Sequence, residues 1–243
     1  YFEPYKKSGI EFTRYCYRYY GNGWLEWKPD AKKGELKAFA QALAGLEPDT
    51  ASGMLKTANA GAPGSVTLRV KSPYAMVKVE LDLDLDQPEG AATTVSFGPV
   101  GKDSKAALSK IWDKTGKAQG VEKVEFVNDK NPIYLYDIKI ETKGSDVKLH
   151  VARLKTIFQL NWASLPSLYP GENTVTVSAK AAQKLQDSKM LITTEWADGK
   201  DWKAEHKDTQ TITELPAIYK IKADVPADKM PKMKRLVMKL EPK

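Results

Sequence analysis

Residues Val147 to Ala179 read VKLHVARLKTIFQLNWASLPSLYPGENTVTVSA: a long strand, a Pro/Gly corner and a second strand. The apolar residues first occupy odd positions and then even ones, at Val147, Leu149 and Val151, then Leu154, Phe158, Leu160 and Trp162. Side chains on a strand alternate faces, so the apolar set changes face around Ala152 and Arg153. A β-bulge there, or a strand that leaves one sheet for another, explains the change. We therefore predict a β-sandwich protein.

Residues 76–86, MVKVELDLDLD, show the clearest alternation in the chain. Odd positions are predicted to face the core (Val77, Val79, Leu81, Leu83 and Leu85), and even ones to face out (Lys78, Glu80, Asp82, Asp84 and Asp86). Three alternating aspartates raise the alternative of calcium, which binds carboxylate oxygens. Such neighbours are about 7 Å apart along a strand, which is too far for one ion without a loop. We expect a solvated acidic face and no metal site.

Further strands and two short helices complete the predicted elements. Strands are expected at 65–71, 93–98, 121–127, 132–142, 173–179, 189–196, 211–222 and 234–240, with a hairpin tip at Asp198-Gly199. Helical spacing predicts short helices at 35–44 and 103–116. The expected fold class is mainly β, a jelly-roll or immunoglobulin-like sandwich.

The N-terminal segment is rich in aromatic residues. IEFTRYCYRYY at residues 10–20 is β-prone, and Gly21-Asn22-Gly23 supplies a turn before Trp24 and Trp27, so we predict a hairpin. One face of its first strand would carry Tyr15, Tyr17 and Tyr19, and the other Phe12, Cys16 and Tyr20. Two aromatic faces allow packing on both sides, a stacking platform for sugars, or a contact with another subunit.

The chain is long enough for two domains, and residues 165–171, LPSLYPG, mark the best boundary. We predict a larger sandwich over 1–163, with the aromatic hairpin and helical insertions, and a smaller immunoglobulin-like sandwich over 164–243. A single extended jelly-roll is the alternative.

Composition restricts the classes of partner. The net charge is +7, with 38 basic and 31 acidic residues, which suits either a solvated surface or attraction to a polyanion. No Arg-rich arm, zinc finger or RNP motif is present, so nucleic acid is not expected. Cys16 is the single cysteine, and no apolar run is long enough to span a membrane. Because the chain begins at Tyr1 rather than Met, we expect a processed or trimmed N-terminus.

Signatures of catalysis are missing from the sequence. The two histidines, His150 and His206, have no metal-ligand spacing with Cys16, and His150 is predicted to lie on the surface. There is no HExxH, GxSxG, P-loop or GxGxxG motif. We therefore expect no enzymatic activity, no cofactor and no catalytic residue.

Three segments carry a resemblance: SVTLRVKSPY at Ser65–Tyr74, NPIYLYDI at Asn131–Ile138 and FQLNWASLPSLYPGENTVTV at Phe158–Val177. They resemble β-sandwich accessory modules of large secreted bacterial proteins, which are often attached to sugar-acting enzymes. The resemblance covers roughly residues 50–243 and implies a secreted, non-catalytic module. It transfers no functional residue.

Two functions follow as hypotheses. The first is a secreted module that binds carbohydrate, an acidic polysaccharide or a cell-surface glycan. Its stacking residues would be aromatic side chains beside turns, together with the hairpin tyrosines: Trp24, Trp27, Trp196, Trp202, Tyr15, Tyr17 and Tyr19. The second is an extracellular structural protein that assembles into a homo-oligomer, a surface layer or a filament through edge strands and the aromatic hairpin.

Overall fold

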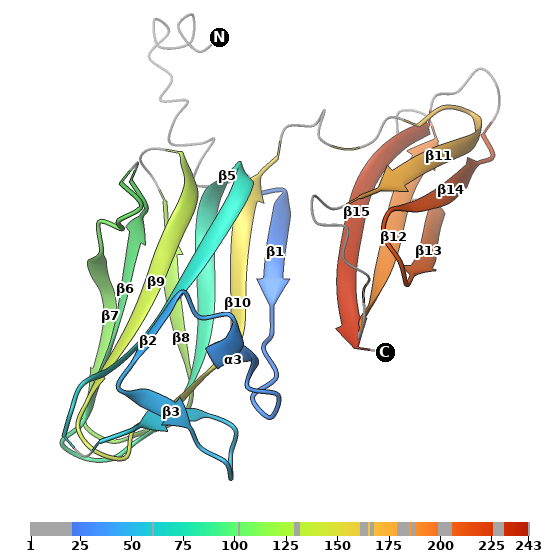
Figure 1. The fold of residues 1–243 in the computed structure, drawn as a ribbon. Coiled ribbons are helices and arrows are strands. Elements are labelled where there is room, and N and C mark those ends of the chain that lie inside the picture. Colours follow the sequence, from blue (N-terminus) through green and yellow to red (C-terminus); the bar gives the residue numbers. More distant parts are fainter. Residues whose placement is uncertain are drawn as a thin grey trace, which may run out of the picture. The chain divides into compact units, whose positions relative to one another are not determined.

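The structure, a computed structural model, describes residues 21–59, 61–101, 103–128, 132–160, 165, 168–178, 185, 188–198, 206–225 and 231–242. The chain divides into two compact units, Tyr1–Leu160 and Asn161–Lys243. Antiparallel strands dominate both, and the described residues include one short helix (Figure 1). The prediction of a mainly β protein is confirmed. The assignment to a jelly-roll or an immunoglobulin-like sandwich, and the domain limits at 163 and 164, stay predictions.

The first unit is built on one extended network of antiparallel strands. Its elements are β1 (Gly23–Trp27), α3 (Glu35–Ala38), β2 (Ala42–Ala44), β3 (Leu46–Pro48), β4 (Leu55–Thr57), β5 (Gly64–Gln87), β6 (Ala92–Pro99), β7 (Ser109–Thr115), β8 (Ala118–Val127), β9 (Ile133–Lys143) and β10 (Lys148–Gln159). The strands follow the order β3-β4-β10-β5-β9-β6-β7, with β1 paired to β10, and β2 and β8 paired to β5.

Strand β5 connects two groups of strands. Its first part pairs with β2 and β9, and its second part, after an irregularity between Lys71 and Met76, pairs with β8 and β10 (Figure 1). The predicted strands at 65–71 and 76–86 are therefore one strand. Inward residues from both parts, such as Val66 and Leu83, belong to the same hydrophobic core. The two groups of strands thus enclose one core.

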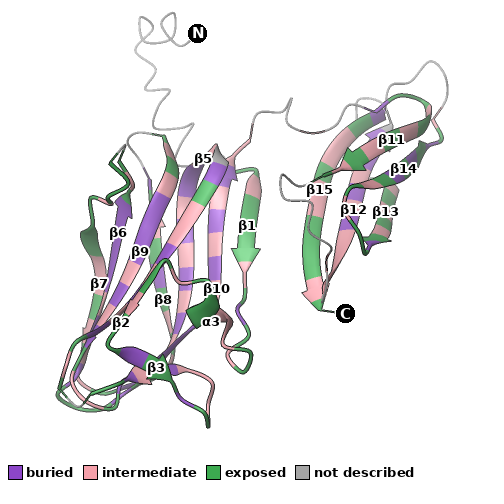
Figure 2. Ribbon diagram, viewed as in Figure 1, coloured by how far each residue is buried: buried purple, intermediate pink, exposed green. Residues whose placement is uncertain are grey.

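The alternation predicted for residues 77–86 is confirmed. All five odd-numbered residues predicted to face inward are 0–3% exposed, while the even-numbered residues are half-buried or exposed (Figure 2). Neighbouring strands bury their own alternating residues against them, including Val124 of β8 and Leu149 of β10. The even-numbered side chains therefore share one outer face with the corresponding residues of β8 and β10.

The predicted change of face in β10 is confirmed as a β-bulge. Val151 pairs with Leu83 and Arg153 pairs with Asp82, so Ala152 is an extra residue with no partner on β5. Val151 and Leu154 are both buried, on either side of the bulge. The extra residue lets both apolar sets of β10 face the same core, as the sequence requires.

The helix predicted at 103–116 is wrong. Residues Ser109–Thr115 form strand β7, which pairs with β6. A register shift there leaves Ile111 without a partner between Lys110 and Trp112, and both Ile111 and Trp112 pack against the core. Two adjacent apolar residues on one side break the period of two and imitate helical spacing.

The helix predicted at 35–44 is shorter than expected. Helix α3 covers only Glu35–Ala38, and Ala42–Ala44 form β2, which pairs with β5. Leu43, assigned to the helix by spacing, packs against the core from a strand instead. Pairing with β5 therefore overrides the local helical pattern after Phe39.

The second strand of the predicted N-terminal hairpin is present as β1. It pairs antiparallel with β10, Trp24 opposite Ile157 and Trp27 opposite Leu154. The first strand of the hairpin, with its tyrosines, lies in residues 1–20, outside the described residues. The hairpin stays a prediction.

The second unit contains β11 (Gly171–Val177), β12 (Ser188–Asp198), β13 (His206–Ile212), β14 (Ala217–Ala223) and β15 (Pro231–Pro242). They form a two-stranded sheet, β11–β14, and a three-stranded sheet in the order β13-β12-β15. Both sheets contribute to one small core, which includes Ile192, Trp196 and Ile221. The strand predicted at 211–222 is interrupted between Ile212 and Ala217, so its halves belong to different sheets. The tip predicted at Asp198-Gly199 leads into residues outside the described ranges, but β12 and β13 pair antiparallel as it requires.

Candidate functional site

The candidate site is the outer face formed by β1, β10, β5 and β8 in the first unit. Strand register aligns the outward side chains of these strands in rows. One row contains Trp24, Ile157, Lys78 and Val127, and the next contains Glu26, Lys155, Glu80 and Glu125. Directly opposite side chains on antiparallel strands contact one another, so the second row brings four charged groups together.

Arg153 occupies the centre of this face because of the bulge at Ala152. The bulge turns its side chain outward, opposite Asp82. Its Nε donates to Asp82 Oδ2 at 2.8 Å and its Nη2 to Oδ1 at 3.3 Å, a two-bond pairing of guanidinium and carboxylate. The side chains of Arg153 and Asp82 are 24% and 19% exposed, so the pair is only partly hydrated.

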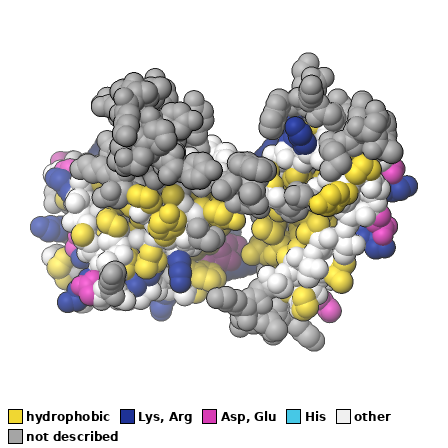
Figure 3. Space-filling view, turned by 90° about the horizontal axis from the view of Figure 1, so that it is seen from above, with side chains coloured by type: hydrophobic (Ala, Val, Ile, Leu, Met, Phe, Trp, Pro, Cys, Tyr) yellow, Lys and Arg dark blue, Asp and Glu magenta, His cyan; other side chains and the backbone are white. Residues whose placement is uncertain are grey.

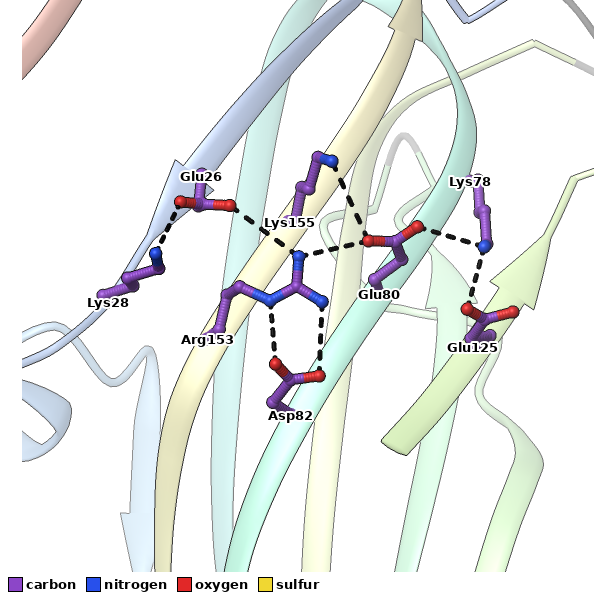
Figure 4. Close-up of polar contacts among 8 residues, drawn as sticks. All are labelled: Glu26, Lys28, Lys78, Glu80, Asp82, Glu125, Arg153 and Lys155. Carbon is purple, nitrogen blue, oxygen red and sulfur yellow. Dashed lines mark hydrogen bonds and ion pairs between the residues drawn. The ribbon is translucent and has the colours of Figure 1, made fainter. Parts of the chain in front are cut away.

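Glu80 links this pair to two lysines. Its Oε2 accepts from Arg153 Nη1 at 3.2 Å and lies 4.0 Å from Lys155 Nζ, and its Oε1 lies 3.0 Å from Lys78 Nζ. Lys78 in turn donates to Glu125 Oε1 on β8 at 2.8 Å (Figure 4). The contacts thus cross from β10 through β5 to β8.

The network extends to β1 through Glu26. Its Oε2 lies 3.7 Å from Arg153 Nη1, and its Oε1 lies 3.0 Å from Lys28 Nζ (Figure 4). We call the eight residues the charged network: Glu26, Lys28, Lys78, Glu80, Asp82, Glu125, Arg153 and Lys155. Four cations and four carboxylates balance within it, so the network offers many charged donors and acceptors and has no net charge of its own.

The contacts hold the network in its ionised form. The hydrogen bond from Arg153 lowers the pKa of Asp82, against the opposing effect of burial. Burial alone would raise the pKa of Glu80, but the hydrogen bond and charge of Lys78, with the charges of Lys155 and Arg153, lower it overall. The hydrogen bond to Glu125 raises the pKa of Lys78. All three groups are therefore charged at neutral pH.

Trp24 lies beside the network at the β1 border. It is 44% exposed, and Lys155 Nζ lies 5.7 Å from its ring centroid, within the range of a cation–π contact. A partly exposed indole ring and fixed charged groups on one sheet face can bind a ring-shaped polar molecule, by stacking on the indole and by hydrogen bonds to the charges.

The other predicted stacking residues lie elsewhere. Trp27 is half-buried, packs against the core and contacts Phe39 edge to face, with ring centroids 5.8 Å apart. Trp196 belongs to the second unit, is 5% exposed and stacks on His206 at 5.4 Å. Trp202, Tyr15, Tyr17 and Tyr19 lie outside the described residues. Of the predicted stacking residues within the described ranges, Trp24 is the one that lies beside the charged network.

His150 is a correction to the sequence prediction. It was expected on the surface because it lies on the outward phase of β10, but it is 8% exposed. Its Nε2 lies 3.0 Å from the carbonyl oxygen of Pro29, which itself is buried. The segment that follows β1 covers this part of the outer face, so the accessible part of the face lies nearer to Trp24.

Two of the acidic side chains of β5, Glu80 and Asp82, take part in ion pairing. Asp82 is bound by Arg153, as described above. Across the described ranges, no group of three or more His, Cys, Asp or Glu side chains is arranged to hold a metal ion. In the same ranges, no helix has the length and apolar character needed to cross a membrane.

Sequence reasoning missed most of the charged network. The alternating acids of β5 were recognised, but the basic residues opposite them were not, because pairing of β5 with β10 was not predicted. The sequence held one usable signal: Arg153 and Lys155 alternate with Leu154 and Thr156 directly after the change of face. These outward-facing basic side chains are complementary in charge to the outward-facing acidic side chains of residues 80–86.

No protein-family model and no curated protein sequence matches the chain. Solved structures to which it is similar include the carbohydrate-binding module TmCBM61 in complex with β-1,4-galactotriose, with a TM-score of 0.32 and 9% identity over 61% of this chain and 97% of that one. A second similar structure is the enzymatically active domain of tailspike protein 4 of bacteriophage CBA120. Its TM-score is 0.33, and the sequence identity is 9% over 61% of this chain and 21% of that one.

The glycoside hydrolase domain of Spr0440, Endo-D from Streptococcus pneumoniae R6, gives a TM-score of 0.33 and 13% identity over 90% of this chain and 37% of that one. The chain thus spans about a fifth and somewhat over a third of the two enzymes. At these identities and TM-scores, the likeness assigns no role to this chain.

Proposed function

We propose that this chain is a secreted, non-catalytic module that binds carbohydrate through the outer face of β1, β10, β5 and β8. The observation that carries the proposal is the half-exposed ring of Trp24 beside the charged network. A sugar ring offers C–H groups that stack on an indole and hydroxyl groups that need fixed donors and acceptors. The network supplies both in an orientation fixed by strand register.

Acidic polysaccharide is the proposed ligand class. The net charge of +7 attracts polyanions, and Lys155 places an ammonium group next to the face of Trp24, where a sugar carboxylate would meet it. The network itself is balanced, so the long-range attraction must come from lysines elsewhere on the chain. Binding is therefore expected to weaken with salt, because exposed charges are screened over about 8 Å at physiological ionic strength.

Calorimetric titration of the full chain tests the proposal. The probes are polygalacturonate as the acidic ligand and β-1,4-galactotriose as the neutral one, each at low and at physiological salt. We expect binding to polygalacturonate that weakens at higher salt, and a Trp24→Ala variant that binds at least about tenfold more weakly, since one lost stacking contact costs roughly 1.5 kcal/mol.

The matched control is Tyr134→Ala, which removes an aromatic side chain of the same unit with 51% exposure, away from the charged network. This variant should bind like the parent chain. Equal affinity of the Trp24→Ala variant and the parent would remove Trp24 from the site. Tighter, salt-independent binding to the neutral probe would contradict the acidic ligand class but keep the carbohydrate-binding face.

A further inference from the structure

Strand β15 lies at the border of the three-stranded sheet of the second unit. It pairs with β12 along its length, from Pro231 opposite Asp198 to Pro242 opposite Ser188. Within the described ranges no strand pairs with its other edge, and Figure 1 shows β15 at the side of β12 away from β13. An edge strand of this length presents a row of backbone donors and acceptors to another strand.

The core-facing side of β15 is exposed at this edge. Met238 lies opposite Ile192 of β12, a core residue that is 1% exposed, so both side chains are on the inner face of the sheet. Yet Met238 is 58% exposed and Leu240 is 61% exposed (Figure 2). Hydrophobic side chains also reach the surface elsewhere on the molecule (Figure 3). Met238 and Leu240 differ because they continue the apolar face of a sheet up to an edge that no described strand pairs with.

The order of residues in β15 is complementary to itself in one antiparallel register. With a twofold axis at Met238, Leu236 lies opposite the partner's Leu240, and Met238 opposite the partner's Met238. On the outer face, Arg235 lies opposite the partner's Glu241, and Val237 opposite the partner's Lys239. Apolar side chains thus meet on the inner face, and the guanidinium meets a carboxylate on the outer face.

Neighbouring registers are less favourable. A twofold axis at Val237 places Arg235 opposite the partner's Lys239, and like charges directly opposite each other destabilise a strand pair. An axis between two residues would place inner side chains opposite outer ones, because side chains alternate with a period of two. In the register at Met238, Arg235 lies between Glu195 of its own chain, 3.8 Å away, and the partner's Glu241.

We propose that β15 pairs antiparallel with β15 of a second copy of this chain, about a twofold axis at Met238. The pairing joins the two three-stranded sheets into one continuous sheet and covers Met238 and Leu240 in both copies. The interface is isologous, so it closes at the dimer. This inference is independent of the carbohydrate-binding proposal, since it concerns the second unit only.

A disulfide across the axis tests the register. In a Cys16→Ser background, which removes the single native cysteine, Met238→Cys places two thiols directly opposite each other. Opposite residues of an antiparallel pair have Cα atoms about 4.5 or 5.5 Å apart, which a disulfide can span. We expect mild oxidation to convert this variant into a covalent dimer on a non-reducing gel.

The control is Leu236→Cys in the same background. In the proposed register, position 236 of one chain and position 236 of the partner are offset by four residues along the strands. At 3.3 Å per residue this is about 13 Å, which is too far for a disulfide. A mixture of the Leu236→Cys and Leu240→Cys chains should form a mixed disulfide, because these positions face each other. Equal cross-linking of Leu236→Cys with itself and of Met238→Cys with itself would overturn the register.

Sedimentation equilibrium tests the association without cross-linking. The full chain should show a concentration-dependent dimer, and Met238→Lys should shift it to monomer because two ammonium groups would face each other across the axis. Ile218→Lys, at a position that is 68% exposed on β14, should leave the dimer unchanged. A chain that remains monomeric at high concentration, or a dimer that Met238→Lys does not weaken, would overturn the proposal.

Discussion

Strands β5 and β15 share one kind of sequence pattern and have opposite surroundings. Both alternate apolar with charged residues, acidic in β5 and mainly basic in β15. In β5 the inward apolar residues of its second part are buried, and two of its acids, Glu80 and Asp82, are paired with Arg153, Lys155 and Lys78. In β15 Met238 and Leu240 are exposed. An alternating pattern therefore defines two faces, and only the neighbouring strands decide whether these faces are covered.

The largest expected difference between the two strands concerns their apolar residues. Leu83→Ala, at a position with 0% exposure in β5, should lower the free energy of unfolding by about 3 kcal/mol, because it leaves a cavity in the core. Leu240→Ala in β15 should change it by less than about 0.5 kcal/mol in dilute solution. Chemical denaturation followed by circular dichroism measures both. Similar losses for the two variants would show that Leu240 is covered.

The next effect concerns the charged partners of the two strands. Arg153→Ala leaves Asp82 and Glu80 partly buried without their guanidinium, so we expect a loss of about 2 kcal/mol in unfolding free energy. Arg235→Ala should cost less than about 0.5 kcal/mol, because Arg235 is 47% exposed and 3.8 Å from Glu195. Denaturation at low protein concentration measures both variants in the monomer. A double-mutant cycle of Arg153 and Asp82 should show strong coupling.

The smallest effect concerns pH. The pKa of Asp82 is lowered by Arg153, so its stabilising contribution is present above the unfolded-state pKa and is lost as pH falls through the folded-state pKa, below 3.8. Between pH 7 and pH 2, Asp82→Asn should therefore lose less unfolding free energy than the parent chain does. Glu241→Gln in β15 should show a smaller change of the same sign, since the Lys239 contact that lowers the Glu241 pKa is more exposed. Parallel pH profiles for Asp82→Asn and the parent would contradict the role of the ion pair.

The fold was predicted correctly from the sequence where apolar and polar residues alternate without interruption along a strand, or where this alternation changes face once. The change of face at Ala152 and the inward set of residues 77–85 were both confirmed. Residues 103–116 were wrongly predicted as a helix because the register shift opposite Val95 places Ile111 and Trp112 on the same side of the strand. In the sequence alone, such a bulge has the same apolar spacing as a helical turn. Pairing partners distant in sequence decided that segment.

The candidate site could be predicted only in part. The turn signal before Trp24 makes it a candidate, and the structure places it half-exposed on a sheet face, while its role in binding stays a prediction. The charged network was not found, since it depends on β1, β10, β5 and β8 being neighbours, and strand order is a property of the whole unit. The burial of His150 was also not foreseeable, because the segment that covers it comes from Pro29, far away in the sequence.

The acidic face of β5 has a further consequence during synthesis. β5 ends at Gln87, but its partner β10 begins only at Lys148. During synthesis, β5 therefore stays without this partner until the residues between them and β10 itself have been made. An unpaired strand with five regularly spaced apolar residues would invite aggregation with other chains. Glu80, Asp82, Asp84 and Asp86 repel identical strands during this interval, and charges placed this way protect exposed strands. Glu80 and Asp82, which later bind Arg153 and two lysines, therefore first help to keep the nascent chain from associating with its own copies.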